Sequence, residues 1–194
     1  DDVLPNVVLY AGIGGITQGS VTRMQGKYII TAVAVEAEGR VVAVHNMNHL
    51  EVPVLHQQMV NMSQTLSSLE KFLPKQFWCN AWVHASNSCN QASTSNMGMR
   101  DLQQAKADTD WTIQLMQRVA PAVWTLENVP VLYQFYQRAF PTSYVYEMNK
   151  YCCLPQSRRR MILSNRQLHL RPIQEEALSV RETLEAREGW DAKT

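Results

Sequence analysis

The sequence predicts an α/β fold with a doubly wound, mostly parallel sheet, and three observations support this fold class. Short apolar runs alternate along the chain with longer segments in which apolar residues recur every three or four positions, as when strands alternate with helices. The first apolar run ends in a glycine-rich turn, since four of the eight glycines lie between Gly12 and Gly19. The 194 residues suit one domain, and no internal repeat or linker marks a second.

The first half of the chain supplies three expected strands and two expected helices. The strands are the apolar runs Asn6–Tyr10, Tyr28–Val35 and Ala81–Ala85. The helices are a stretch over residues 38–50 and a longer one at Val54–Leu73, with apolar positions three or four apart. A loop rich in Ser and Asn follows over residues 86–98.

The second half continues the alternation. Asp101 suits the start of a helix that runs to Val119. After it we expect, in order, a strand at Ala122–Leu126, a helix at Val131–Phe140, strands at Tyr144–Met148 and Arg159–Leu163, and a helix at Ile173–Arg187. We therefore divide the chain into a main domain over residues 1–172 and a C-terminal helix and tail over residues 173–194.

Composition and charge exclude several classes of protein. With 45% hydrophobic and 18% charged residues, the chain can form an ordinary core. Eighteen Lys and Arg against seventeen Asp and Glu leave a net charge of +1, so no overall positive field attracts nucleic acid. No apolar run reaches the ~18 residues that a membrane span needs, and no signal-peptide pattern opens the chain.

The cysteines and the first residues bear on the compartment. The four cysteines do not resemble a disulfide framework, and two of them, Cys152 and Cys153, are adjacent. We expect a reducing, intracellular compartment, which is nuclear or organellar in a eukaryote and cytoplasmic in a bacterium or phage. The chain begins at Asp1 without an initiator Met, so we expect that upstream residues, with an organelle presequence as one explanation, have been removed or lie outside this sequence.

The segment VLYAGIGGITQG lies where the first strand turns into the first helix. Glycines there let the backbone approach a ligand closely, and a helix N-terminus presents free N–H groups. Glu36 closes the second strand, where a carboxylate can accept two hydrogen bonds from ribose hydroxyls. We expect a cofactor with an adenosine moiety, either a dinucleotide or S-adenosylmethionine; the glycine spacing disfavours the dinucleotide. A plain glycine turn beside a solvated Glu is the alternative.

Cys89 follows the third expected strand, in the polar segment HASNSCNQAS. A thiol at the carboxyl edge of a sheet is positioned like a nucleophile, whereas structural cysteines have apolar surroundings. Taken alone, Cys89 is still better interpreted as a partly buried, inert thiol.

Glu127 and Asn128 close the next strand in the segment TLENVP, and Pro130 fixes the exit of the chain. A carboxyl group at that point would lie over the same crevice as Cys89. A helix-capping Glu-Asn pair is an equally good interpretation of this motif in isolation.

The segment PQSRRRMIL carries three arginines into an apolar strand. Strand periodicity places Arg158 and Arg160 on one face and Arg159 on the other. Two guanidinium groups on one strand face are costly unless an anion or a polar ligand meets them. A surface edge strand is the alternative.

Other conspicuous side chains are interpreted as structural. His45 and His49 lie one helical turn apart, but no carboxylate or cysteine accompanies them, so we predict no metal site. The large aromatic residues are interpreted as packing residues: Trp78, Trp82, Trp111, Trp124, Tyr133, Phe135, Tyr136 and Phe140.

The ordered set AGIGG, VEAEG, SCNQAS, ENVP and QSRRR resembles the cytosine-5 DNA methyltransferase family, from about Val7 to Leu163. ENVP together with QSRRR is quite specific to that family, whereas the glycine loop alone is not. The resemblance implies a Rossmann-like catalytic domain that binds S-adenosylmethionine. It also implies a covalent mechanism on a cytosine that is flipped out of the helix.

The resemblance implies roles for individual residues. Cys89 would attack C6 of the cytosine, Glu127 would protonate N3, and Arg158 and Arg160 would hold the base and the developing charge. The cofactor would be bound by Tyr10, Gly12, Ile13, Gly14, Gly15 and Glu36. The substrate-binding set would be Asn90, Asn128 and Gln156.

The sequence departs from the family pattern at several positions. Ser88 replaces the proline that stiffens the cysteine loop, and Asn90 replaces the usual Gln. Val8 and Ser63 stand where acidic residues are expected. The family's target-recognition domain and late Gly-Asn-Ser-type motif do not follow Leu163 in this sequence, so we expect a partner protein or a further segment to supply target recognition.

Functions from different classes therefore stay open. The first is transfer of a methyl group from S-adenosylmethionine to C5 of cytosine in nucleic acid, with DNA favoured over RNA. The second is an inactive methyltransferase-like domain that serves as a structural or RNA-binding part of a larger assembly. Ser88, the short length and the missing recognition domain favour the second function. The intact side chains that oppose it are Cys89, Glu127, Arg158 and Arg160. The glycine spacing disfavours a third, a nicotinamide-dependent oxidoreductase.

Overall fold

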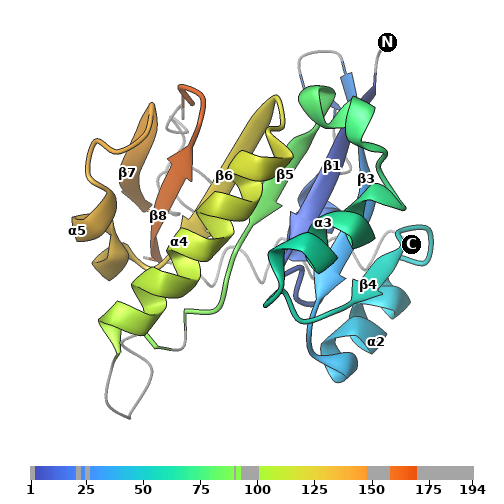
Figure 1. The fold of residues 1–194 in the computed structure, drawn as a ribbon, viewed down its shortest axis with the longest axis horizontal. Helices are drawn as coiled ribbons and strands as arrows, with labels where there is room; N and C mark the ends of the chain where they lie inside the picture. The colour runs from blue at the N-terminus through green and yellow to red at the C-terminus, as the bar shows by residue number, and fades with distance from the viewer. Residues whose placement is uncertain are drawn as a thin grey trace, which may run out of the picture.

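The computed structural model describes residues 3–20, 23–24, 27–89, 91–92, 101–147 and 158–169, which form an α/β fold around one eight-stranded sheet (Figure 1). The strands are β1 (Val3–Leu9), β2 (Arg23–Met24), β3 (Lys27–Glu36), β4 (Val54–His56), β5 (Trp82–Ala85), β6 (Val123–Asn128), β7 (Thr142–Glu147) and β8 (Arg159–Ser164). They lie in the order β2-β3-β1-β5-β6-β8-β7, and β4 also pairs with β3.

The centre of the sheet is parallel. Strand β1 pairs in parallel with β3 and β5, β5 pairs in parallel with β6, and β4 does so with β3. Strand β8 runs antiparallel to both β6 and β7, and the short β2 runs antiparallel to β3. The carboxyl ends of β1, β3, β5 and β6 therefore meet at one edge of the sheet, where ligands bind in open α/β folds.

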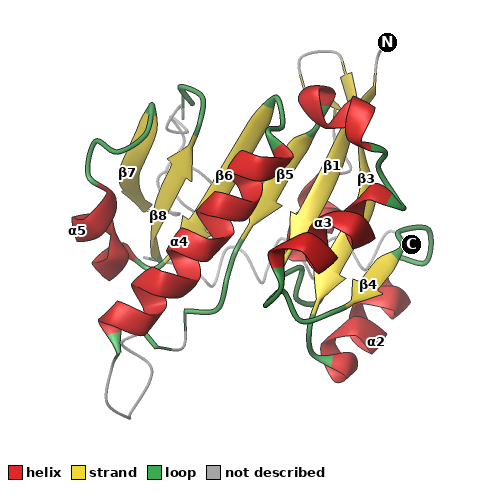
Figure 2. Cartoon of the chain, in the orientation of Figure 1, coloured by secondary structure: helices red, strands yellow, loops and turns green. Residues whose placement is uncertain are grey.

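Helices lie on both faces of this sheet. They are α1 (Gly15–Ser20), α2 (Gly39–Asn48), α3 (Met62–Glu70), α4 (Leu102–Val119) and the short α5 (Tyr133–Tyr136), together with the 3₁₀ helices η1 (Lys75–Asn80) and η2 (Pro130–Leu132). Figure 2 shows α3 and α4 on the viewer's side of the strands. Asp101 caps α4 by accepting a hydrogen bond from the Gln104 N–H (2.8 Å), as expected for this residue at a helix start.

The residues of β1 alternate between two apolar clusters. Val7 and Leu9 belong to the large cluster that also contains Met116 of α4, whereas Val8 joins a small cluster with Ala34, against which Ile16 of α1 packs. Successive strand residues point to opposite faces, so both faces of the sheet are buried. The doubly wound, mostly parallel fold predicted from the sequence is confirmed.

The helix predicted at Val54–Leu73 is wrong over its first eight residues. Val54–His56 forms β4, because these residues extend the parallel ladder of β3, and the Ala34 N–H donates to the carbonyl of Pro53 at 3.0 Å. Helix α3 begins only at Met62, after Asn61, whose side chain accepts from the Gln64 N–H. Apolar residues do recur every three or four positions in this segment, but the segment contains a strand, a loop and a helix.

Two further predicted helices differ from the structure or fall outside it. The helix predicted at Val131–Phe140 is reduced to η2 and α5, and the chain turns at Arg138, whose φ is 59°. The aromatic group in this segment packs on the core, as predicted. The predicted helix at Ile173–Arg187 and the rest of the tail lie outside the described residues.

Candidate active site

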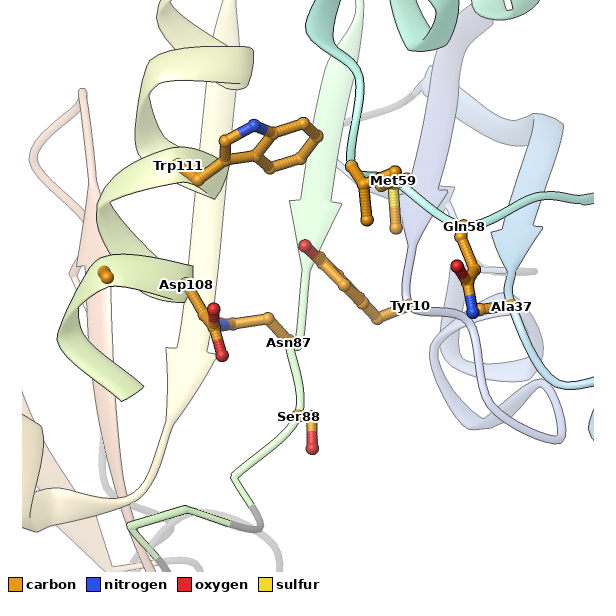
Figure 3. Close-up of a pocket in the computed structure, with 10 residues that line it drawn as sticks. Tyr10, Ala37, Gln58, Met59, Asn87, Ser88, Asp108 and Trp111 are labelled. Carbon is orange, nitrogen blue, oxygen red and sulfur yellow. The ribbon is translucent and has the colours of Figure 1, made fainter. Parts of the chain in front are cut away.

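The loop after β1 adopts positive φ angles at Tyr10 (57°), Gly12 (56°) and Gly14 (101°). Glycine adopts such angles at little cost, whereas a tyrosine in this region is strained by about 1–3 kcal/mol. The Ala11 N–H donates to the carbonyl of Val35 (3.0 Å), which ties the loop to β3. The turn sends the Tyr10 side chain from the end of β1 toward helix α4 (Figure 3).

Gly14 packs against the two histidines that the sequence singled out. A Cβ atom on Gly14 would collide with the ring of His49 and crowd that of His45. The His49 Nε2–H donates to the Gly14 carbonyl (3.0 Å), and His45 Nε2 shares a hydrogen bond with the Thr17 hydroxyl (3.0 Å). Burial lowers the pKa of His45, and the neighbouring His49 lowers it further. The two histidines therefore hold the glycine loop in place by packing against Gly14. The described residues contain no cluster of three metal-binding side chains.

Glu36, at the end of β3, binds the glycine loop through backbone groups. Its Oε2 accepts from the Gly12 N–H (3.0 Å), and its Oε1 accepts from the N–H groups of Ala37 (2.8 Å) and Glu38 (3.0 Å). A carboxylate offers about four acceptor positions, so these three bonds leave one position on Oε2. That position could accept a hydrogen bond from a ligand hydroxyl.

A cavity of about 490 Å³ opens beside this loop, at the carboxyl edge of the sheet (Figure 3). This volume lies within the usual range for small-molecule sites. The strand ends β1, β3 and β5, the segment after β4 and helix α4 all contribute to its lining: Tyr10, Ala37, Gln58, Met59, Val60, Asn87, Ser88, Ala107, Asp108 and Trp111.

Tyr10 crosses one side of the cavity to reach helix α4. Its hydroxyl lies 3.0 Å from the Thr112 hydroxyl, which itself donates to the Asp108 carbonyl (2.9 Å), so Tyr10 is the donor. Burial raises the pKa of Tyr10, which keeps this hydroxyl protonated. Asp108 is the only carboxylate among the described residues that line the cavity. The cavity therefore combines aromatic and thioether surfaces with one negative charge.

Glu127 and Arg160 are brought together across β6 and β8. The Arg160 Nε lies 2.5 Å from Glu127 Oε1 in an ion pair, and the side chains are only 17% and 20% exposed. The Ser86 hydroxyl donates to the other oxygen, Oε2, at 2.7 Å. Each carboxylate oxygen thus has its own partner, so the Glu127 side chain is held in one orientation.

Asn128, next to Glu127 on β6, points to the opposite face of the sheet and links the end of β6 to the loop after β5. Its Nδ2 donates to Asn87 Oδ1 (3.0 Å), and its own Oδ1 accepts from the Val129 N–H (2.7 Å). Asn128 is 2% exposed and so lies below the surface of the site. From this position Asn128 stabilises the loop after β5.

Cys89 lies three residues after Ser86, in the loop that leaves β5. It is a free, half-buried thiol that packs against the large apolar cluster, and its carbonyl accepts from the Ala92 N–H (2.9 Å). Within the described part of the chain, the thiol makes no hydrogen bond to Glu127. The structure thus places Cys89 on the loop that Ser86 anchors to Glu127, without joining the two groups directly.

The remaining arginines, the predicted substrate-binding residues and the predicted cofactor residues are placed as follows. Arg158 is exposed and precedes β8, whereas Arg159 faces the surface beside Glu147 (3.8 Å). Asn90 and Gln156 lie outside the described residues. Of the predicted cofactor residues, Tyr10 lines the cavity; Gly12 and Gly14 shape the loop beside it, and Ile13 and Gly15 are exposed.

Several residues of the site were not singled out from the sequence. Trp111 was interpreted as packing only, but its ring lies against the cavity. Gln58, not Ser63, lines the cavity from the segment after β4, because the predicted helix there is in fact a strand and a loop. Ser86 could have been found, since it follows a buried strand at the edge that carries Glu127. Asp108 had no such signal, because its helix position resembles that of any solvent-facing residue.

No protein-family model matches the sequence, and no curated protein matches it. Solved structures do match. A protein described as a DNA modification methyltransferase encoded within an E. coli prophage has a TM-score of 0.67 at 16% identity, over 93% of this chain and 54% of its own. The S. pombe Dnmt2 methyltransferase has a TM-score of 0.56 at 16% identity, over 95% and 54%. A methyltransferase of Entamoeba histolytica has a TM-score of 0.56 at 14% identity, over 92% and 58%.

The fold is therefore the Rossmann-like fold of these methyltransferases, as the sequence resemblance implied. The chain spans little more than half the length of each of these proteins. Among the helices that the structure describes, none combines the length and apolar character needed to span a membrane.

Proposed function

We propose that this chain transfers a methyl group from S-adenosylmethionine to C5 of cytosine in DNA, through a covalent bond between Cys89 and C6. The observation that carries the proposal is the Glu127–Arg160 pair (2.5 Å), which the Ser86 hydrogen bond connects to the loop of Cys89. A carboxyl group and a guanidinium held together beside a thiol loop provide the acid, the charge stabiliser and the nucleophile that this reaction requires.

The cavity fits S-adenosylmethionine in size and in chemistry. Tyr10, Met59 and Trp111 offer flat or polarizable apolar surfaces for a purine ring. The free acceptor position of Glu36 suits a ribose hydroxyl, and Asp108 supplies a negative charge for a cationic cofactor. S-adenosylmethionine, when bound, supplies the methyl group that C5 accepts.

The residues of the chain account for the remaining steps. The Cys89 thiolate forms a bond to C6 while Glu127 gives a proton to N3, which makes C5 nucleophilic. Arg160 stabilises the carboxylate left on Glu127. After methyl transfer, water removes the C5 proton, and the electrons of the C5–H bond restore the C5–C6 double bond. The Cys89–C6 bond breaks with its electrons on sulfur, which regenerates the Cys89 thiolate, and the N3 proton returns to Glu127.

A partner protein or a further segment is part of this proposal. The chain carries a net charge of +1 and spans about half the length of the solved relatives. Target recognition in DNA requires side chains in the grooves, and we assign none in this chain. A reducing compartment is also proposed, since Cys89 must stay a free thiol.

Covalent trapping tests the proposal. Oligonucleotides that contain 5-fluorocytosine are incubated with the chain and S-adenosylmethionine, with and without candidate partners, and adducts are resolved by denaturing electrophoresis. Fluorine at C5 blocks the final elimination, so we expect a stable adduct that requires the cofactor and is absent in Cys89→Ala. The matched control is Cys79→Ala, which removes the other free cysteine in the described part of the chain and should keep the adduct.

Three outcomes would contradict the proposal. An adduct that persists in Cys89→Ala would exclude the assigned nucleophile. An adduct with RNA but not with DNA would change the substrate. No adduct with any partner would favour the second function, an inactive methyltransferase-like domain with a structural or RNA-binding role.

A further inference from the structure

We propose that Ser86 is a positioning residue for Glu127, and that its hydroxyl holds the carboxyl group in the orientation that the reaction needs. The inference rests on the proposed function, because it assigns Ser86 a part in the proton transfer between Glu127 and the base. Ser86 was not among the residues that the sequence motifs singled out.

The hydrogen bonds of Glu127 show how the orientation is fixed. Ser86 Oγ donates to Oε2 at 2.7 Å, and Arg160 Nε forms an ion pair with Oε1 at 2.5 Å. One partner alone would leave the carboxylate free to rotate about its last bond, which is a soft torsion. Two partners, one on each oxygen, restrict the plane of the group. Arg160 is itself held, since its Nη1 donates to the Arg159 carbonyl (2.8 Å).

Ser86 also connects Glu127 to the cysteine loop. It is the first residue after β5, and its N–H donates to the carbonyl of Leu9 at 3.4 Å. The next residue, Asn87, bonds Asn128 at 3.0 Å. Two consecutive residues of the loop are therefore bonded to two consecutive residues of β6. This double link sets the distance between Glu127 and the loop that carries Cys89.

The hydroxyl of Ser86 can follow the proton of Glu127. It donates to Oε2 while the carboxyl group is ionised, and after rotation of the O–H bond it can accept from a protonated Oε2. When the Glu127 proton moves to N3, Ser86 and Arg160 stabilise the resulting carboxylate. When the Cys89–C6 bond breaks, the same proton returns from N3 to Glu127. Ser86 makes no bond to the substrate in this sequence of steps.

The test compares Ser86→Ala with Ser86→Thr, which keeps a hydroxyl. Initial rates are measured with the chain, the partner that supports trapping, DNA and S-adenosylmethionine. For Ser86→Ala we expect kcat to fall about tenfold, the lower end for a lost hydrogen bond to a charged group, with KM for the cofactor within about twofold. Ser86→Thr should retain at least about half of kcat. A merely structural role would change both parameters and would not be rescued by Thr.

A second arm measures the contact without catalysis. Chemical unfolding is followed for wild type, Ser86→Ala, Glu127→Ala and the double variant. We expect the loss of stability caused by Ser86→Ala to disappear when Glu127 is already Ala, because the two groups act through one bond. Equal losses in both backgrounds would overturn the inference.

The outcomes separate this inference from the proposed function. If wild type forms the adduct but Ser86→Ala keeps the wild-type kcat, Ser86 is not a positioning residue, and the proposed function stands. If wild type forms no adduct with any partner, the proposed function and this inference both fall. A coupled unfolding cycle together with the selective loss of kcat would support the inference.

Discussion

Two glutamates at the same edge of the sheet, Glu36 and Glu127, are held in different ways. Glu36 accepts three hydrogen bonds, all from backbone N–H groups of Gly12, Ala37 and Glu38. Glu127 is held by two side chains, Ser86 and Arg160. The proposed cofactor half of the site therefore depends on the path of the backbone, whereas the proposed catalytic half depends on particular side chains on or directly after three strands.

This difference has a physical consequence for substitutions. A backbone N–H is present whatever the side chain, so the cofactor half should tolerate many side-chain changes but no change in the shape of its loop. In the catalytic half, each removed side chain leaves a half-buried charged group without its partner, which is costly. Four predictions follow this contrast, from the largest expected effect to the smallest.

Gly14→Ala should be the most destabilising change in the cofactor half. Alanine at a φ of 101° is strained, and its Cβ would collide with the buried ring of His49. We expect the free energy of unfolding, measured by chemical unfolding, to fall by about 3 kcal/mol or more.

Gly19→Ala is the matched control. Its Cβ would meet nothing within 4 Å inside helix α1, and alanine should leave stability equal or raise it by up to about 1 kcal/mol. Equal losses for both variants would refute the backbone argument.

His84, buried on β5, should make the protein sensitive to acid. Burial lowers the pKa of His84 to about 4 in the folded state, against 6.5 when unfolded. Between these values the unfolded chain binds a proton that the folded chain does not, so stability is full above about pH 6.5 and falls toward pH 4. The loss is at most about 1.4 kcal/mol per pH unit, or about 3 kcal/mol in total.

The variant His84→Leu should flatten this pH dependence. Unfolding free energies are measured at pH 7 and pH 4.5 for the variant and the wild type. His45 should keep part of the slope in the variant, because its pKa is also lowered in the folded state. An unchanged slope would show that His84 is not neutral and buried in solution.

Arg160→Ala and Arg159→Ala compare a protected ion pair with an exposed one. Arg160 is 17% exposed and lies 2.5 Å from Glu127, whereas Arg159 is 61% exposed and lies 3.8 Å from Glu147. We expect Arg160→Ala to lower the free energy of unfolding by about 1–2 kcal/mol and to abolish trapping. Arg159→Ala should cost less than about 0.5 kcal/mol and keep trapping. Similar losses of stability would mean that the pair with Glu127 is as weak as a surface pair.

Apart from the control variants, Glu36→Gln should have the smallest effect on stability. The amide keeps one oxygen acceptor but replaces the other with a donor that faces backbone N–H groups, so we expect a loss of about 1 kcal/mol. Affinity for S-adenosylmethionine, measured by calorimetry, should fall about tenfold, because the acceptor for the ribose is lost. A change in cofactor affinity smaller than twofold would remove Glu36 from the cofactor site.

The fold was predicted largely from the sequence, because the strands of a parallel sheet are buried on both faces and appear as continuous apolar runs. The prediction failed where local and tertiary preferences differ. Val54–His56 follows Pro53 and is short, and its strand exists only because the edge of β3 is available to pair with it. Helix spacing alone could not reveal that edge.

The candidate site was predicted in part. Glu127 was assigned to the same crevice as Cys89, which stays a prediction, whereas the ion pair of Glu127 with Arg160 emerged only from the structure. The roles of all the predicted site residues, Glu127 and Arg160 included, stay predictions. Gln58, Asp108 and Trp111 were placed at the cavity only by the structure, because a loop glutamine or a residue on a helix has no distinctive pattern until its neighbours are known.

The sequence by itself determined the order of the main strands and helices, the glycine loop and the types of side chain at the strand ends. These properties are local: apolar periodicity, turn-forming residues and the residue that follows each strand. Only the tertiary structure decided which groups meet. Ser86 and Glu127 are 41 residues apart, and Gly12 and Glu36 are 24 apart. Their contacts depend on the parallel registers of β1, β3, β5 and β6, and a register is a property of paired strands that no single strand contains.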